Sequence, residues 1–413
     1  MKAEILATGN EVLSGTVVDT NSAFVALQLE GAGFAVERHS CVGDAPRVLA
    51  KTLAEIGARA EVAVVTGGLG PTDDDCTALA AARAAGVALK IDPEALASIQ
   101  SFFAQRQWAL SDANRKQALL PEGARCIPNP VGTAPGFVMT IERCRFFFLP
   151  GVPREMRRML LDSVLPELHA LGSPVRKVRV ISTFGLAESK VAELLAGFED
   201  LFPDILLGLQ ARFPEIHIRL YESEGSGEDR FQAVFDWIRK RLGQKVLSEK
   251  GRSLEAVAGD LLRLRQVTVA VAESCTGGLV ASLLTDVSGS SDYFVLGAVT
   301  YANSAKVKVL GVSPATLEEH GAVSEAVARE MAVGIRRLAG SDYGISTTGI
   351  AGPTGGSADK PVGTVCIGLA TPSSAEAWRY RFTFDDRAMN KQVFAATALN
   401  RLRRALIKSA EAA

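Results

Sequence analysis

The sequence predicts a multidomain α/β protein, because strand-like and helix-like segments alternate along most of its 413 residues. Its length allows two or three domains, at about 100–200 residues each. Hydrophobic residues make up 47% of the chain and charged residues 22%, as in ordinary globular proteins. Glycine-rich turns directly follow two of the predicted strands, which is where open α/β sheets bind ligands.

The first expected domain, residues 1–170, is an α/β unit with a largely parallel sheet. Short apolar runs rich in valine and phenylalanine predict its strands, and apolar residues at helical spacing predict its helices. The strands are expected at 3–7, 34–42, 61–65 and 145–149, and the helices at 20–29, 45–56, 75–85, 93–105 and 154–168.

The second expected domain, residues 171–250, has a β-α-β-β-α-β order and is predicted to be a small α+β sandwich. Its elements are expected at 175–182, 188–195, 205–210, 216–222, 230–242 and 245–247, with a polar loop at 224–229. Residues 249–252 are expected to form a hinge to the next domain.

The third expected domain, residues 251–413, is again α/β. Strands are expected at 268–272, 294–301, 343–347, 364–370 and 376–384, and helices at 254–264, 279–284, 303–310, 324–338 and 387–408. Residues 349–363 are rich in glycine and are expected to form a loop.

Composition restricts the partners and the compartment. A formal net charge of -1 gives no general attraction to nucleic acid or to an anionic membrane. The six cysteines are scattered without metal-binding spacing, which indicates a reducing compartment and no structural zinc. The first residues are too charged for a signal peptide, and no uncharged apolar run approaches about 20 residues. We therefore expect a soluble, cytoplasmic protein.

The turn at 273–278 (Glu-Ser-Cys-Thr-Gly-Gly) joins a predicted strand to a predicted helix. Backbone N–H groups and the positive end of the helix dipole should lie beside the Ser274 hydroxyl, where an oxyanion is stabilised. The alternative is an ordinary N-cap whose glycines only allow close packing of strand and helix. The turn alone leaves both interpretations open.

A serine nucleophile needs a base, and no histidine of this domain is well placed, since His320 lies in a polar turn. A buried lysine with a lowered pKa is an alternative base. Lys306 and Lys308 lie about 200° apart around the predicted helix, so at most one faces the site. Cys275 is adjacent to Ser274 but is expected to point away from it.

In the first domain, a predicted strand runs into residues 66–77, a glycine-rich turn followed by acidic residues. Gly67, Gly68 and Gly70 would let backbone N–H groups approach a phosphate, and the acids would hold a divalent ion against it. The alternative is a solvated aspartate cluster that caps a helix. Loops at 8–11, 43–44, 129–136 and 150–156 are expected to converge on the same pocket.

Two strings of the first domain are highly specific: Thr-Gly-Gly-Leu-Gly-Pro-Thr at 66–72 and Pro-Gly-Val-Pro-Arg-Glu-Met at 150–156. With these strings, nearly the whole chain resembles the CinA family (competence/damage-inducible protein). The first domain also resembles the molybdopterin-binding domains of molybdenum-cofactor biosynthesis.

For the first domain, the resemblance implies an ADP-ribose pyrophosphatase that uses Mg, Mn or Co and produces AMP and ribose 5-phosphate. Asp44 and Asp75 would hold the metal. The other implied site residues are Glu11, Asn21, Gly67, Gly68, Gly70, Asp74 and Asn129.

The third domain is similar to nicotinamide-nucleotide amidases, which convert nicotinamide mononucleotide to nicotinate mononucleotide and ammonia. The matching strings are Ser-Cys-Thr-Gly-Gly at 274–278, Tyr-x-Asn-x-x-Lys at 301–306 and Thr-Gly-Ile-Ala-Gly-Pro at 348–353. The resemblance implies catalysis by Ser274, Lys306 and Tyr301 without a cofactor. Substrate would bind at Gly277, Gly278, Thr348, Gly349 and Arg387, with backbone N–H groups of 275–278 at the oxyanion.

One stretch departs from the amidase pattern: the family's Gly-Asp-Arg is Asp385-Asp386-Arg387 here. Lys391 stands where relatives often have arginine. The middle domain resembles a KH-like fold, but residues 185–188 lack the second glycine of a nucleic-acid-binding loop, so we expect a scaffold.

Together these expectations describe a homodimeric, bifunctional hydrolase of pyridine-nucleotide salvage. A first rival is an N-terminal domain that only binds a pterin or nucleotide. A second is an accessory protein of DNA uptake or recombination. The absence of a basic stripe in the sequence weighs against direct DNA binding, though not against a protein partner.

Overall fold

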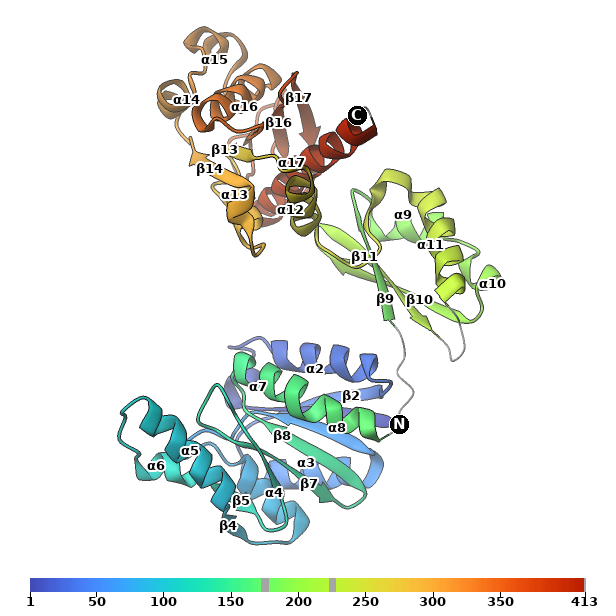
Figure 1. Cartoon of the computed structure of the whole chain (residues 1–413), viewed down its shortest axis with the longest axis vertical. Coiled ribbons are helices and arrows are strands. Elements are labelled where there is room, and N and C mark those ends of the chain that lie inside the picture. Colours follow the sequence, from blue (N-terminus) through green and yellow to red (C-terminus); the bar gives the residue numbers. More distant parts are fainter. Residues whose placement is uncertain (172–177, 223–227, 412–413) are drawn as a thin grey trace. The chain divides into compact units, whose positions relative to one another are not determined.

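The computed structural model describes residues 1–171, 178–222 and 228–411. The chain divides into two compact units. The first is the N-terminal domain, Met1–Val178, and the second combines the KH-like residues, Arg179–Tyr221, with the later part of the chain. Figure 1 shows the helices and strands of each unit.

The N-terminal unit is built on a six-stranded sheet of order β2-β1-β3-β8-β7-β6. Strands β2 (Ala35–Val42), β1 (Lys2–Thr8), β3 (Val62–Thr66) and β8 (Cys144–Leu149) are parallel. Strands β7 (Gly136–Ile141) and β6 (Arg125–Ile127) complete the sheet in antiparallel orientation. Strands β4 (Leu89–Ile91) and β5 (Leu119–Pro121) form a separate pair.

Helices cover both faces of this sheet, so the N-terminal unit has two apolar cores (Figure 1). One face carries α3 (Pro46–Arg59), α4 (Thr77–Ala85) and α5 (Pro93–Gln105). The other carries α2 (Thr20–Gly31), α7 (Pro153–Met159) and α8 (Leu165–Ala170). A π-helical turn, Leu160–Val164, joins α7 to α8, where the sequence predicted one uninterrupted helix. Two short helices are α1 (Asn10–Leu13) and α6 (Asp112–Lys116).

The KH-like residues form a four-stranded sheet of order β10-β11-β9-β12. The elements are β9 (Val178–Phe184), α9 (Glu188–Leu194), α10 (Phe198–Leu201), β10 (Ile205–Arg212), β11 (Glu215–Glu222), α11 (Glu228–Leu242) and β12 (Val246–Ser248). The predicted β-α-β-β-α-β order is confirmed. Residues 175–177 of the expected first strand and 224–227 of the expected loop lie outside the described residues.

The C-terminal residues form a five-stranded sheet of order β14-β13-β15-β16-β17. Strands β14 (Phe294–Val299), β13 (Val269–Glu273) and β15 (Tyr343–Gly349) are parallel, and β16 (Thr364–Ala370) and β17 (Ala375–Arg381) are antiparallel. α16 (Glu325–Ala339) packs on one face. α12 (Leu254–Arg265) and α17 (Arg387–Glu411) belong to the core of the other. The remaining helices are α13 (Leu279–Thr285), α14 (Asn303–Leu310) and α15 (Pro314–His320).

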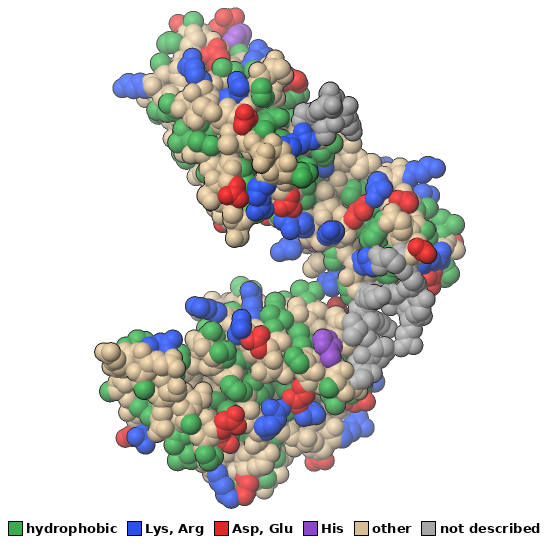
Figure 2. All heavy atoms as spheres, viewed as in Figure 1, with side chains coloured by type: hydrophobic (Ala, Val, Ile, Leu, Met, Phe, Trp, Pro, Cys, Tyr) green, Lys and Arg blue, Asp and Glu red, His purple; other side chains and the backbone are tan. Residues whose placement is uncertain are grey.

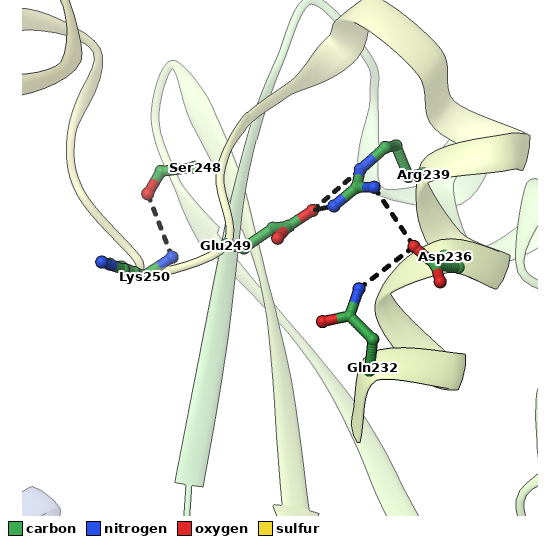
Figure 3. Close-up of polar contacts among 6 residues, drawn as sticks. All are labelled: Gln232, Asp236, Arg239, Ser248, Glu249 and Lys250. Carbon is green, nitrogen blue, oxygen red and sulfur yellow. Dashed lines mark hydrogen bonds and ion pairs between the residues drawn. The ribbon is translucent and has the colours of Figure 1, made fainter. Parts of the chain in front are cut away.

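The segment 249–252, expected to be a hinge, is a packed connection instead. Arg239 of α11 donates to Glu249 Oε1, with a distance of 2.9 Å from Nε, as Figure 3 shows. Ser182 Oγ donates to the carbonyl of Arg252 at 2.6 Å. Phe184 and Leu247 of the KH-like sheet also belong to the C-terminal core cluster. Apolar packing therefore joins the KH-like and C-terminal parts in addition to these hydrogen bonds.

Charged side chains of both signs are interspersed on the face shown in Figure 2, as the net charge of -1 suggests. Within the described part of the chain, none of the helices has the length and apolar character needed to cross a membrane.

Candidate functional site

Both α/β sheets place their loops in the same way. In each, the first strand lies between the second and the third in the sheet, so the chain leaves it toward opposite sides. Loops that follow such neighbouring parallel strands diverge and open a crevice at the strands' carboxyl ends. Ser274 follows β13 and Thr348 lies near the end of β15 at one such crevice. Gly9 and Gly67 follow β1 and β3 at the other.

Ser274 and Lys306 meet in the C-terminal crevice. Lys306, on α14, is only 1% exposed, and its Nζ lies 3.2 Å from Ser274 Oγ. The same ammonium nitrogen donates to the carbonyl oxygens of Thr300 and Tyr301, each at 3.0 Å. Lys308 is exposed, so the structure brings Lys306 to the serine and leaves Lys308 on the surface.

The surroundings of Lys306 favour its neutral form. Burial lowers the pKa of Lys306 below its ordinary value. A neutral amine has two N–H donors and one lone pair. When the two carbonyl oxygens accept both N–H groups, the lone pair is left for the Ser274 hydroxyl proton. This is the arrangement that a general base requires.

The turn after Ser274 is held by Glu273, a carboxylate that is 1% exposed. Glu273 accepts hydrogen bonds from the backbone N–H groups of Gly278 (2.9 Å), Val280 (3.1 Å) and Ala281 (2.8 Å). This role of Glu273 was not predicted from the sequence. The signal was present, because an acidic residue at the end of a fully apolar strand, directly before a helix, is suited to cap that helix.

Glu273 changes which N–H groups can face an oxyanion. The N–H of Gly278 is taken by Glu273, and the N–H of Gly277 donates to the carbonyl of Ser274 at 3.2 Å. The expectation that these two N–H groups serve the oxyanion is therefore wrong. Among the described residues, the N–H groups of Cys275 and Thr276 donate to no backbone carbonyl, and the Cys275 N–H lies near its own thiol. Gly277 and Gly278 have φ values of 62° and 96°, so they shape the turn instead.

The side chains of Cys275 and Thr276 are both buried. Burial raises the pKa of the Cys275 thiol to about 12, which excludes a ready thiolate. The Thr276 hydroxyl is fully buried and lies 2.6 Å from the hydroxyl of Thr347 on β15. These contacts lock the backbone on which Ser274 sits.

The remaining predicted residues surround the crevice. The Tyr301 side chain is 64% exposed, and its hydroxyl lies 3.5 Å from an Arg387 guanidinium nitrogen. Arg387, at the start of α17, also donates to the carbonyl of Gly352 at 2.6 Å. Thr348 Oγ1 donates to the carbonyl of Ala322, so this hydroxyl has a structural partner. Gly349 packs its backbone against β16, where a Cβ would collide with Thr364.

Asn390 is a further residue that sequence reasoning missed. It is fully buried on α17, and its amide donates to the carbonyls of Ala351 (3.0 Å) and Phe384 (2.8 Å). It thereby fixes the loop after β15 to the helix that carries Arg387. A polar residue three positions before the apolar Val393 was the available signal.

The N-terminal crevice is a cavity of about 440 Å³. Its lining includes most of the predicted residues of this domain: Glu11, Asn21, Asp44, Gly67, Gly68, Gly70, Asp74 and Asp75. Gly67 and Gly68 adopt φ values of 109° and 65°, which allows the backbone to turn tightly against Thr8 and Thr77. Asn129 lies behind the wall and donates to Glu155, a lining residue, at 2.7 Å.

The acidic loop of this cavity is internally hydrogen-bonded. Asp75 Oδ2 accepts from the Thr72 backbone N–H (2.9 Å) and hydroxyl (2.7 Å). The hydrogen bond from the Thr72 hydroxyl lowers the pKa of Asp74. Asp73 points to solvent, near Lys116. The aspartates do not cap α4, because its N-cap residue, Cys76, makes no side-chain capping hydrogen bond, and Asp75 accepts from Thr72 instead.

Asp44 approaches from the loop after β2. Its carboxylate accepts from the Asn10 N–H at 2.9 Å, and the Asn10 side chain accepts from the Asp44 N–H at 3.2 Å. Burial raises the pKa of the Cys76 thiol, and the charges of Asp44 and Asp75 raise it further. The two carboxylates that were expected to bind metal line the same cavity.

The donor set fits a metal that keeps most of its own water. Within residues 1–171, 178–222 and 228–411, no group of three or more His, Cys, Asp or Glu side chains is arranged as a metal cage. Asp44 and Asp75 both line one cavity, where their carboxylate oxygens could hold such an ion. Mg²⁺ is commonly held in this way, by one or two carboxylates together with substrate phosphates.

The fold and the sites define a class of protein with two α/β domains, each of which has polar loops at its crevice. A KH-like domain lies between them in the sequence. The N-terminal residues 4–170 match the probable molybdopterin binding domain, 178–247 the damage-inducible protein CinA KH domain, and 251–406 the CinA C-terminal domain.

Relatives match this chain over almost its whole length. The CinA-like protein of Desulfosudis oleivorans is 51% identical over 98% of this chain and 100% of its own length. That of Geobacter sp. strain M21 is 46% identical over 98% of both chains. A solved structure of CinA from Thermoplasma acidophilum, 35% identical, covers 40% of this chain and 97% of its own, with a TM-score of 0.38. The chain belongs to the CinA family.

Proposed function

We propose that the C-terminal site hydrolyses the carboxamide of nicotinamide mononucleotide, releasing ammonia and nicotinate mononucleotide. The observation that carries the proposal is the 3.2 Å contact between Lys306 Nζ and Ser274 Oγ, made by a lysine that is 1% exposed. A serine with a buried amine as its base is suited to acyl transfer without a metal. The hydrolase role also agrees with membership of the CinA family.

The first step forms an acyl-enzyme. Lys306 Nζ accepts the Ser274 hydroxyl proton while Oγ attacks the carboxamide carbon. The resulting oxyanion accepts hydrogen bonds from the N–H groups of Cys275 and Thr276. Lys306 then returns its proton to the leaving amide nitrogen, and the C–N bond breaks to release ammonia.

The second step regenerates the serine. Water loses a proton to Lys306 and attacks the ester carbon, and the proton passes to Ser274 Oγ as the C–O bond breaks. Arg387 is suited to bind the phosphate of the mononucleotide, since it lies at the rim beside Tyr301. Lys391 lies near Gly277 on the same side and adds a second positive charge.

The test is release of ammonia from nicotinamide mononucleotide by the purified protein, in the presence of a chelator. Turnover that a chelator does not affect supports a serine-lysine site. Absence of turnover over a range of substrate concentrations would contradict the proposal.

We propose in addition that the N-terminal site cleaves ADP-ribose to AMP and ribose 5-phosphate with a divalent cation. The supporting observation is the charge of the cavity. Six carboxylates line it (Glu11, Asp19, Asp44, Asp74, Asp75 and Glu155), and none of the described lining residues is Lys or Arg. A diphosphate would be repelled there unless cations accompanied it, and a divalent cation also polarises the phosphoryl oxygens during hydrolysis.

Within that site, the chain's own residues would bind and orient the substrate. Asp44 and Asp75 would hold the cation, and the backbone of Gly67 and Gly68 would approach the diphosphate. The test is metal-stimulated release of AMP from ADP-ribose. Binding of a pterin or nucleotide without cleavage, at every divalent metal tried, would instead support a binding module.

A further inference from the structure

A cavity of about 390 Å³ lies within the second compact unit, between α17 and the end of α11. We call it the basic cavity, and its wall includes Gln244, Val246, Arg403, Arg404, Ile407 and Lys408. It is separate from both crevices described above. Its volume falls in the range of about 300–1,000 Å³ that is usual for small-molecule sites.

The charge of the basic cavity is the opposite of that of the N-terminal crevice. Four of its lining residues are cations, the fourth being Arg239, and none of the described lining residues is Asp or Glu. Arg239 already forms ion pairs with two carboxylates, Glu249 and Asp236, as Figure 3 shows. Its distance to Asp236 Oδ1 is 3.1 Å. The nearby carboxylates are therefore committed to Arg239.

Arg403 is a buried cation that has no carboxylate partner among the described residues. It is 4% exposed and donates only to neutral acceptors: the carbonyl of Gln244 (2.8 Å), the carbonyl of Val246 (3.5 Å) and Asn400 Oδ1 (3.0 Å). Burial lowers the pKa of Arg403, and the neighbouring charge of Arg404 lowers it further. A guanidinium nevertheless remains charged in proteins, so an anion nearby would be strongly favoured.

Arg404 and Lys408 are the groups that can reach a ligand. They lie four residues apart, so they share one face of α17. Arg404 is steadied by Gln244 Oε1, and Lys408 is exposed. In the described part of the chain, neither forms an ion pair with a carboxylate.

The remaining wall of the basic cavity is apolar. Ile407 is 37% exposed there, and Val246 lies opposite α17 in the KH-like part. A bare inorganic ion would leave this surface in water. A ligand with both an anionic group and an organic body would cover it.

We propose that the basic cavity binds an organic phosphate of about nucleotide size. Its phosphate would accept hydrogen bonds from Arg404 and Lys408, with Arg403 behind them, and its organic part would lie on Ile407 and Val246. Because the wall comes from both α17 and residues 243–246, the bound ligand would hold these two segments together.

The test is hydrogen exchange of the full-length protein, followed peptide by peptide, with AMP as the probe and chelator present. We expect AMP to slow exchange at residues 243–248 and in the last turns of α17. The apparent affinity should fall about tenfold in Arg404→Gln and in Lys408→Gln, since each removes one charge-assisted hydrogen bond. It should be unchanged in Lys240→Gln, which removes an exposed charge of α11 outside the cavity.

Three results would overturn the proposal. One is no protection of 243–248 at millimolar AMP. Another is protection by AMP in Arg404→Gln and Lys408→Gln that equals the protection in the natural protein, when exchange elsewhere shows that both variants are folded. The third is protection by a ligand other than AMP. Protection by inorganic phosphate as strong as that by AMP would assign the cavity to a simple ion, and protection by a single-stranded oligonucleotide but not by AMP would assign it to nucleic acid.

Discussion

Ser274 and Lys306 lie 32 residues apart in the sequence, on two elements that the sheet brings to one crevice. Their contact depends on the turn after β13 and on the register of α14. Sequence reasoning identified both residues, because a serine in a strand-to-helix turn and a lysine at a helix start are visible as patterns. Helix geometry alone left Lys306 and Lys308 open, and the resemblance to the amidases selected Lys306. The structure adds the contact itself, because Lys306 is buried beside the serine and Lys308 is exposed.

We expect Ser274→Ala to reduce ammonia release from nicotinamide mononucleotide by about 10³-fold or more, because it removes the attacking oxygen. The alanine removes little volume, so circular dichroism and thermal unfolding should be nearly unchanged. Cys275→Ala is the matched control and should retain activity, since the Cys275 thiol is buried. Near-normal turnover by the serine variant would disprove the assignment.

The pH dependence follows from the direction of the pKa shift. Burial lowers the pKa of Lys306, and only the neutral amine accepts a proton, so the rate should rise with pH. The midpoint of the rise should lie below the free lysine value of about 10.4. The measurement is kcat/KM against pH, with Lys306→Ala abolishing the activity and Lys308→Ala leaving it intact. If Lys308→Ala abolished the activity and Lys306→Ala left it intact, the assignment of Lys306 as the base would be wrong.

At the scale of single elements, helix starts and loops fix the reactive groups. Glu273 accepts three backbone N–H groups at the start of α13 and leaves those of Cys275 and Thr276 to the crevice. In the N-terminal unit, Thr72 organises the carboxylates of Asp74 and Asp75. These are local interactions between residues two to eight positions apart, which hydrophobic periodicity does not reveal.

Glu273→Gln should destabilise the C-terminal part by about 1–3 kcal/mol, because an amide nitrogen replaces one of the two accepting oxygens. Denaturant unfolding of the full-length protein, followed by hydrogen exchange in α13, measures this effect. The turnover of nicotinamide mononucleotide should fall as well, since the turn that orients Ser274 loosens. Glu255→Gln, in the first turn of α12, is a control for the loss of one acidic charge near a helix start.

Asp75→Asn should abolish metal-dependent cleavage of ADP-ribose, because an amide binds a divalent cation much more weakly than a carboxylate does. Asp73→Asn changes a solvent-facing carboxylate of the same loop and should have no effect. Metal titration by calorimetry separates the two variants without relying on turnover. If both variants bind metal and cleave substrate like the natural protein, the loop has no role in metal binding.

At the scale of the whole molecule, the order of helices and strands along the chain could be predicted more completely than the pairing of strands within the sheets. Buried parallel strands such as β3 and β13 are continuous apolar runs, so they are visible in the sequence. The β6 and β7 edge was missed, since β6 is three residues long and β7 follows a loop rich in proline and glycine. The stacking of Phe137 on Phe148, with ring centroids 4.3 Å apart, fixes that edge and depends on a pairing that the sequence does not display.

The packed connection at 249–252 decides where the chain can be divided. A fragment of residues 178–413 should deamidate nicotinamide mononucleotide without added metal, because it contains the whole second unit. A fragment beginning at Ser253 should keep the site but melt at a lower temperature, since it loses the contacts of Phe184 and Leu247 with the C-terminal core. Equal melting temperatures would show that these contacts contribute little.

The long helix α17 has a consequence for the order in which the protein is made. It packs on α12, α13, β15 and β16 and buries Phe394, Leu399 and Leu402, yet it follows all of these elements in the chain. A ribosome therefore releases the serine and the lysine well before the helix that closes the apolar face and brings Arg387. A nascent chain that stalls before α17 is an incompletely folded domain with an exposed apolar face. We expect it to be bound by chaperones or degraded by proteases and to have no enzymatic activity.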